Sequence, residues 1–226
     1  MNFQKIIFFF LTFSIQHLTF NISFGQALNS YGFTIGLTRS TEKWDSTDYS
    51  QKMKFRSGFN GSFFLEYYYH NRFTWRTELE YNLKGAKLLD SNTVVGKSRT
   101  KYVCWNNYLR IRHEMYDYTP YILIGPRVEY LLAAIGTPAN LPPKNYEDYN
   151  GILKQFHFSA AVGGGCEYNI YDPWILFAEL YYNPDVTNSY TQNNFHIKNR
   201  AWELKVGIKK KLNSMRDFEK CPPVYL

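Results

Sequence analysis

Apolar and polar side chains alternate along several long stretches of the sequence. In residues 55–69 one face is apolar and the opposite face is mostly polar. The apolar face carries Phe55, Phe59, Phe63, Leu65, Tyr67 and Tyr69, and the polar face carries Arg56, Asn60, Ser62 and Glu66. Because side chains two residues apart share one face of a β-strand, this period of two predicts a strand and does not fit a helix.

Residues 74–84 and 202–209 repeat this arrangement, with charges at every second position of one face. Five further stretches show weaker alternation, namely residues 31–39, 102–114, 120–132, 156–168 and 174–182. The sequence therefore predicts eight strands. An even number of antiparallel strands can close on itself with both chain ends on the same side, which leaves no sheet edge unpaired.

The predicted connections alternate in length. Those near residues 40–54, 87–101, 133–155 and 183–198 are long and polar, whereas those near 70–73, 115–119 and 169–173 are short. Outer-membrane barrels have short periplasmic turns and longer outside loops. The connection 133–155 contains many turn-forming residues, so we expect it to be the most mobile.

The decisive question is which face of each strand points outward. Arg76, Glu78 and Glu80 share one face, and large aromatic and aliphatic residues occupy the other. We therefore predict an all-β fold, an eight-stranded antiparallel up-and-down transmembrane β-barrel with a side-chain-filled lumen. The alternative is a secreted β-sandwich or lipocalin-like barrel, in which the apolar face would point inward.

The first 25 residues have the features of a secretory signal peptide. Lys5 precedes the apolar run 6–15, and small residues come before Gln26. The run is about half the ~20 residues that a membrane-spanning helix needs, which argues against the alternative of an anchor. We predict a signal peptide at 1–25, an outer-membrane β-barrel at 26–212 and a periplasmic C-terminal tail at 213–226.

Composition and charge narrow the expected partners. Aromatic residues make up 19% of the chain, and its formal charge of +7 becomes +6 without Lys5 because residues 1–25 contain no Asp or Glu. We expect outer-membrane lipid and lipopolysaccharide as acidic neighbours and no nucleic acid, because an exported chain rarely meets it. Cys104, Cys166 and Cys221 are too few and too scattered to predict a disulfide framework or a zinc site, and the sequence assigns them no role.

Several segments resemble the PorT-type outer-membrane barrel family. They are Tyr108–Ile111, Pro120–Leu132, Ala160–Gly165, Glu179–Tyr182 and Leu204–Ile208, and in order they span residues ~30 to 212. The resemblance implies an eight-stranded barrel in the outer membrane of a Gram-negative bacterium. Its best-known members are linked to type IX secretion and gliding, without an established chemical activity.

Charges of both signs are predicted to face the lumen and to pair with one another. They are Arg56, Glu66, Arg76, Glu78, Glu80, Arg110, Arg112, Arg127, Glu129, Glu167, Glu179, Glu203 and Lys205. Such pairing would plug the barrel. The alternative is a narrow ion or proton path, although a diffusive pore normally needs more strands.

One short motif suggests catalysis. His157 and Ser159 are two residues apart, as in the outer-membrane lipid A deacylases, and Glu167 or Glu179 would orient the histidine. However, the face assignment points both side chains into the lumen, whereas an acyl chain arrives from the bilayer.

The remaining candidates favour structural roles. Gly163, Gly164 and Gly165 lie mid-strand and make room for large side chains. His70, His113 and His196 lie at strand ends or in loops without metal-ligand spacing. Eight aromatic residues are predicted to form girdles at the membrane interfaces, namely Tyr67, Tyr69, Trp75, Trp105, Tyr130, Trp174, Tyr182 and Trp202.

From these patterns we expect a non-enzymatic barrel that acts as a scaffold or partner-binding component in a secretion or envelope complex. No catalytic, cofactor or metal residue is assigned, and no cofactor is expected. A lipid A-modifying enzyme that uses His157 and Ser159 is the alternative, and a narrow pore is the second alternative.

Overall fold

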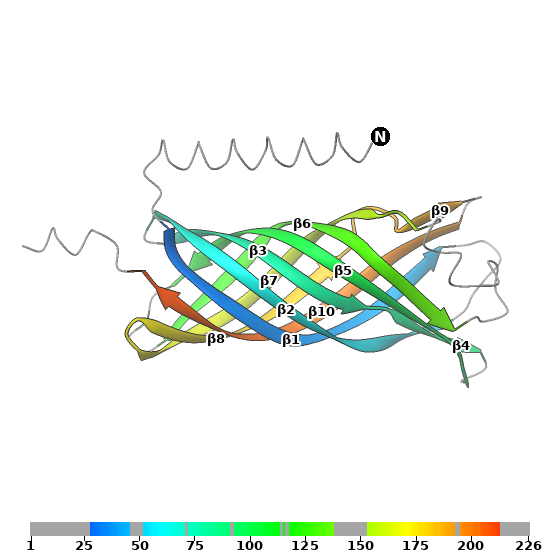
Figure 1. Ribbon diagram of the computed structural model, residues 1–226, viewed down its shortest axis with the longest axis horizontal. Coiled ribbons are helices and arrows are strands. Elements are labelled where there is room, and N and C mark those ends of the chain that lie inside the picture. The colour runs from blue at the N-terminus through cyan, green and yellow to red at the C-terminus, as the bar shows by residue number, and fades with distance from the viewer. Residues whose placement is uncertain are drawn as a thin grey trace, which may run out of the picture.

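The computed structural model describes residues 28–45, 52–70, 72–90, 93–113, 115, 118–137, 153–192 and 195–212 (Figure 1). Its strands are β1 (Leu28–Asp45), β2 (Lys52–His70), β3 (Phe73–Lys84), β4 (Ala86–Asp90), β5 (Thr93–Arg112), β6 (Tyr118–Thr137), β7 (Phe156–Tyr171), β8 (Trp174–Pro184), β9 (Tyr190–Gln192) and β10 (Phe195–Lys211). Within these residues no helix is long and apolar enough to cross a membrane.

The strands form one closed antiparallel barrel. Neighbours run in the order β1, β10, β8, β7, β6, β5, β3 and β2, and β2 pairs again with β1. β4 continues the line of β3, because both pair with β2 on one side and with β5 on the other, and the short β9 pairs only with β10. The predicted eight-stranded up-and-down barrel is therefore confirmed.

Gly85 interrupts the strand between β3 and β4. Its φ of 151° is a conformation that L side chains rarely adopt, and a Cβ atom there would lie 2.1 Å from the carbonyl oxygen of Ser98. The Ser40 hydroxyl accepts a hydrogen bond from the Gly85 N–H and donates one to its carbonyl oxygen, each at 2.8 Å. This bend needs glycine and a neighbouring hydroxyl.

The two ends of the barrel differ. Ser30 pairs with Lys211, so both ends of the described chain lie at the end that also carries the short links between β2 and β3 and between β7 and β8. We call this the terminal end and the opposite one the loop end. Figure 1 shows the start of β1 and the tip of β10 together.

The strands reach further toward the loop end than the alternation predicts. β1 continues to Asp45 and β2 begins at Lys52, so most of the predicted connection 40–54 is strand. Residues 87–101 also belong mainly to β4 and β5, β6 continues to Thr137, and β10 begins at Phe195. In the extensions of β1, β2, β5 and β10 the boundaries were wrong because both faces carry polar residues, so the apolar stripe that marks a strand is missing.

The faces of the strands are as predicted. Phe59, Leu79 and Val206 are 48%, 58% and 48% exposed on the outside, whereas Arg76 and Glu80 are 0% and 1% exposed in the lumen. A water-soluble barrel would place these side chains the other way round. The alternative of a secreted sandwich or lipocalin-like barrel is therefore wrong.

Candidate functional site

The lumen is the site that sequence analysis singled out, and charged side chains fill it. All thirteen predicted inward charges are buried except Arg56 and Arg112, which are half-buried. Lys84 and Lys209, which also lie on the polar faces of their strands, are 2% exposed each. Two groups of ion pairs follow one another along the barrel.

Glu66 is the centre of the first group, which lies toward the terminal end. Arg76 donates to Glu66 Oε1 through Nε at 2.9 Å and through Nη2 at 2.7 Å, and Arg110 Nη1 donates to the same oxygen at 3.0 Å. Lys209 Nζ and the Ser30 hydroxyl donate to Oε2 at 2.8 and 2.7 Å. One carboxylate thus accepts hydrogen bonds from four side chains on different strands.

Glu167 and Glu179 complete this first group. Arg110 Nη2 lies 2.5 Å from Glu167, which also pairs with Lys209. Arg76 Nη1 lies 2.6 Å from Glu179. The group then contains three cations and three carboxylates, so its formal charges cancel.

Two glycines of β7 make room for tyrosines that hold Glu179. The hydroxyls of Tyr121 and Tyr181 donate to the two oxygens of Glu179 at 2.6 and 2.8 Å. A Cβ atom on Gly163 would lie 2.6 Å from the Tyr181 ring, and one on Gly165 would lie 2.8 Å from Tyr121. The prediction that the glycines accommodate large side chains is confirmed for Gly163 and Gly165 but is wrong for Gly164, where a Cβ atom would meet only a backbone oxygen at 3.4 Å.

Lys205 links the carboxylates of the second group, nearer the loop end. Its Nζ lies 2.8 Å from both Glu78 and Glu80 and 3.5 Å from Glu203. Arg127 pairs with Glu203 at 3.0 Å and with Glu129 at 2.8 Å.

Lys84 completes the second group by pairing with Glu129 at 2.6 Å. The second group therefore holds three cations, Lys84, Arg127 and Lys205, against four carboxylates, Glu78, Glu80, Glu129 and Glu203.

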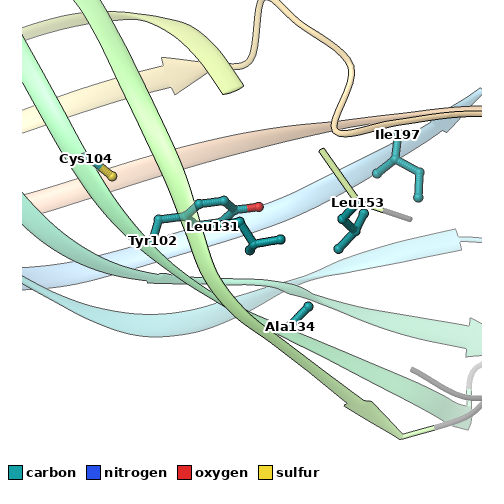
Figure 2. Packing of buried hydrophobic residues seen from close by; sticks show 6 residues of the cluster. All are labelled: Tyr102, Cys104, Leu131, Ala134, Leu153 and Ile197. Atoms are coloured by element: carbon teal, nitrogen blue, oxygen red, sulfur yellow. The ribbon is translucent and has the colours of Figure 1, made fainter. Parts of the chain in front are cut away.

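An apolar cluster begins at the level of the second group and extends toward the loop end. Figure 2 shows its six residues. It consists of Tyr102, Cys104, Leu131, Ala134, Leu153 and Ile197. Leu153 comes from the connection before β7, which is tied down by backbone hydrogen bonds from Leu131 to Gln155 and from Lys154 to Ser189. This segment packs into the barrel and reduces access to the lumen from that end.

His157 and Ser159 lie in the lumen, 0% and 4% exposed, as the face assignment predicts. They make separate contacts. The Ser159 hydroxyl donates to Glu129 Oε1 at 3.1 Å, whereas the His157 ring meets the Tyr102 ring edge-on at 5.6 Å. Glu167 and Glu179, the proposed partners of His157, belong to the first group of ion pairs.

Asp185 anchors a third polar contact at the loop end. It accepts hydrogen bonds from the backbone N–H and side-chain amide of Asn199 at 3.0 and 3.1 Å, and from Ser189 at 3.1 Å. Burial raises the pKa of this carboxyl to about 6. The sequence does not predict that Asp185 is buried, because residues 183–198 were predicted to be a loop and the alternation assigns no inward face in a loop.

The two described cysteines are not joined by a disulfide. Cys104 is buried and accepts a contact from Arg127 at 3.1 Å, Cys166 is exposed, and both are free thiols, whereas Cys221 lies outside the described residues. No group of three metal-ligating side chains occurs in the part of the chain that the structure describes.

The outer surface carries the apolar band. Seven of the eight predicted girdle aromatics lie on the outward face, among them Tyr182 and Trp202, whose ring centroids are 4.8 Å apart. The side chain of Tyr69 lies outside the described residues. Phe33, Ile35 and Leu37 on β1 are 57–63% exposed, and Leu204, Val206 and Ile208 on β10 are 41–53% exposed. An exposed band of this kind on a closed barrel is typical of contact with lipid.

Residues 19–191 match the family described as "Outer membrane protein beta-barrel domain". The chain belongs to this family. Among curated proteins none matches the sequence.

Solved structures of outer-membrane barrels resemble this member of the family. OprG from Pseudomonas aeruginosa is 10% identical with a TM-score of 0.52, and the match covers 84% of this chain and 98% of OprG. Neisserial surface protein A is 15% identical with a TM-score of 0.49, covering 80% of this chain and 97% of that one. Ail of Yersinia pestis is 16% identical with a TM-score of 0.40, covering 81% and 99%. At such identities the likeness concerns the fold.

This outer-membrane β-barrel lies in the outer membrane of a Gram-negative bacterium. Because outer-membrane barrels have short periplasmic turns and longer outside loops, we expect the terminal end to face the periplasm and the loop end to lie outside. The apolar band faces lipid. His157 and Ser159 lie in the lumen, so the barrel wall separates them from the acyl chains.

Proposed function

We propose that this barrel is a non-enzymatic scaffold or partner-binding component of the outer membrane. The observation that carries the proposal is the closed lumen, in which six buried cations pair with buried carboxylates. Such a barrel offers its two ends and its outer face for contacts, since its interior is occupied. The PorT-type resemblance supports a more specific role in type IX secretion or gliding.

The partner is expected at the long connections or at the C-terminal tail. Residues 138–152 of the predicted connection 133–155 and the tail 213–226 lie outside the described residues. The described strands that flank them form a wall of paired strands, and binding residues are commonly carried by loops on a rigid scaffold.

Co-purification from native outer membrane tests the proposal. The full chain, tagged after Leu226, is crosslinked in cells and isolated under denaturing conditions, and bound proteins are identified by mass spectrometry. We expect one envelope protein to be enriched over a tagged barrel of another family. Replacing residues 138–152 with a short Gly-Ser linker, and separately replacing 46–51, shows which connection binds it.

Two outcomes contradict the scaffold role. The first is recovery of the barrel alone, with no envelope protein above the level of the control barrel. The second is single-channel conductance of the purified protein in planar bilayers, which would favour the narrow pore. To test the secretion role, the extracellular proteins of a deletion strain are compared with those of the strain complemented with the wild-type gene, and unchanged secretion and gliding would exclude it.

A further inference from the structure

On three strands the outward side chains change from apolar to cationic at the same level of the barrel wall. On β1 the outward positions are Phe33, Ile35 and Leu37, followed by Arg39, Thr41 and Lys43. On β10, going in the same direction, they are Ile208, Val206, Leu204 and Trp202, followed by Arg200 and Lys198. On β5 they are Trp105 and Val103, followed by Lys101, Arg99 and Lys97. In each strand the lipid-facing band ends and cations begin toward the loop end.

These cations form two patches. Patch one consists of Arg39, Lys198 and Arg200 on β1 and β10, where Arg39 lies opposite Trp202 and Arg200 opposite Thr41. Patch two consists of Lys87, Arg99 and Lys101 on β4 and β5.

Among the side chains that the structure describes, this surface carries no carboxylate. Every Asp or Glu whose side chain the structure describes is buried in the lumen, except Asp172 in the turn at the terminal end. Within the described residues, no carboxylate pairs with a cation of patch two. In patch one, the Arg39 guanidinium lies 5.2 Å from the ring centroid of Phe55. Within the described side chains, the two patches therefore carry positive charge that is not paired with a carboxylate.

Most of the exposed cations at the loop end lie on one side of the barrel. β6, β7 and β8 contain a single cation, Arg127, and its side chain is in the lumen. The exposed Lys154 precedes β7, but the outward side chains of these strands at the loop end include Phe158 and Leu132, which are apolar. A general need for solubility would not place both patches on β10, β1, β4 and β5.

We propose that the two patches bind the phosphate groups of lipopolysaccharide in the outer leaflet. The cations begin where the apolar band ends, and that is the depth at which lipid A carries its phosphates beside the acyl chains. Arginine and lysine side chains both bind phosphate, arginine through two parallel hydrogen bonds. The apolar stripes of β1, β5 and β10 contact the acyl chains of the same lipid molecules.

Binding of bisphosphorylated lipid A to the purified full-length protein in detergent tests this proposal. Two triple variants neutralise the patches, R39Q/K198Q/R200Q and K87Q/R99Q/K101Q. The matched control R72Q/K210Q/K211Q removes three cations at the terminal end, where Arg72 and Lys211 are exposed and Lys210 is half-buried. We expect each patch variant to weaken binding at least about tenfold, while the control changes it less than about twofold.

Three further measurements make the result decisive. Dephosphorylated lipid A should bind the wild-type protein as weakly as bisphosphorylated lipid A binds the patch variants. Millimolar inorganic phosphate should not displace lipid A, and displacement would assign the patches to free phosphate. Heat-modifiable gel migration confirms that each variant is folded, and Arg99→Gln and Arg200→Gln serve as single substitutions if a triple variant fails to fold. Equal weakening by the control variant, or none by the patch variants, would overturn the proposal.

Discussion

Glu66 is the most connected carboxylate of the lumen. It accepts hydrogen bonds from Arg76, Arg110, Lys209 and Ser30. Glu66→Gln removes one negative charge and leaves the three buried cations of the first group against two carboxylates, Glu167 and Glu179. Because breaking a buried ion pair leaves an uncompensated charge, we expect the free energy of unfolding to fall by about 3–5 kcal/mol.

Urea titration in phospholipid vesicles measures this loss. Asp172→Asn is the matched control, since it removes one carboxylate charge from an exposed turn, and it should change the free energy of unfolding by less than about 0.5 kcal/mol. If both substitutions cost the same, Glu66 would not be the centre of the network.

Gly163 and Gly164 are adjacent but face opposite sides of the wall. A Cβ atom on Gly163 would lie 2.6 Å from the Tyr181 ring, whereas one on Gly164 would meet its nearest atom at 3.4 Å. We expect Gly163→Ala to lower the free energy of unfolding by about 1–3 kcal/mol through overpacking. Gly164→Ala should be close to neutral, and the same urea titration compares the two. A larger loss for Gly164→Ala would contradict the assigned faces of β7.

Asp185 makes stability depend on pH. It lies one residue beyond β8, and burial raises its pKa from 3.8 to about 6. Between these values the folded protein holds a proton that the unfolded chain has released. The free energy of unfolding therefore falls as the pH rises through this window and is level above it. This contribution is at most about 3 kcal/mol.

Asp185→Asn removes this pH dependence and keeps an acceptor for the Asn199 N–H. Unfolding is measured for both proteins at pH 4, 5, 6 and 7.5. We expect the variant to gain stability relative to the wild type as the pH rises from 4 to 6, and a constant difference would show that Asp185 does not titrate in this range.

The sequence predicts which residues face the lumen but not which of them pair. Period-two alternation assigned Lys205 and Glu78 to the inward faces of their strands, and both are buried. Their 2.8 Å contact crosses the barrel between residues 127 positions apart. Such contacts depend on strand tilt and register around the whole barrel, which the local pattern does not contain.

Strand ends were the least predictable elements. Wherever one face is apolar, as in β3, the predicted bounds 74–84 agree closely with Phe73–Lys84. Toward the loop end, β4 and β5 have no continuous apolar stripe, so their residues resemble a polar loop. Main-chain pairing such as Lys87 with Lys97 holds these extensions together, and hydrogen bonds of the backbone leave no mark in side-chain patterns.

The outward face of a strand should tolerate charge only beyond the apolar band. Leu204 on β10 is 53% exposed within the band, and Thr41 on β1 lies among the cations at its outer edge. We expect Leu204→Lys to lower the free energy of unfolding in vesicles by about 2–4 kcal/mol and Thr41→Lys by about 0–1 kcal/mol. In detergent the gap between the two variants should shrink, because micelles adapt to a charged side chain more easily. Equal costs in vesicles would mean that the band is misplaced.

The molecule as a whole separates charge by sign and by position. Nearly every described carboxylate is in the lumen, and the outer rim is cationic. The sequence shows a net positive charge but does not show that the two signs are separated. The separation arises only when the eight strands close into a barrel and the carboxylates on their inward faces come together in the lumen. The closed lumen and the charged rim together direct contacts to the surface of the barrel.

The orientation of the molecule in the membrane can be tested on intact cells. The connection between β6 and β7 should lie outside, so added trypsin should cleave at Lys144 and chymotrypsin near Tyr146 and Tyr149. The turn Asp172–Pro173 between β7 and β8 should resist proteases until the outer membrane is opened. For a control that does not depend on the accessibility of natural sites, one protease recognition sequence is inserted after residue 146 and, separately, after Asp172. Cleavage of the second protein but not the first in intact cells would invert the barrel, and the cationic rim would then face the periplasm, where lipopolysaccharide phosphates do not reach it.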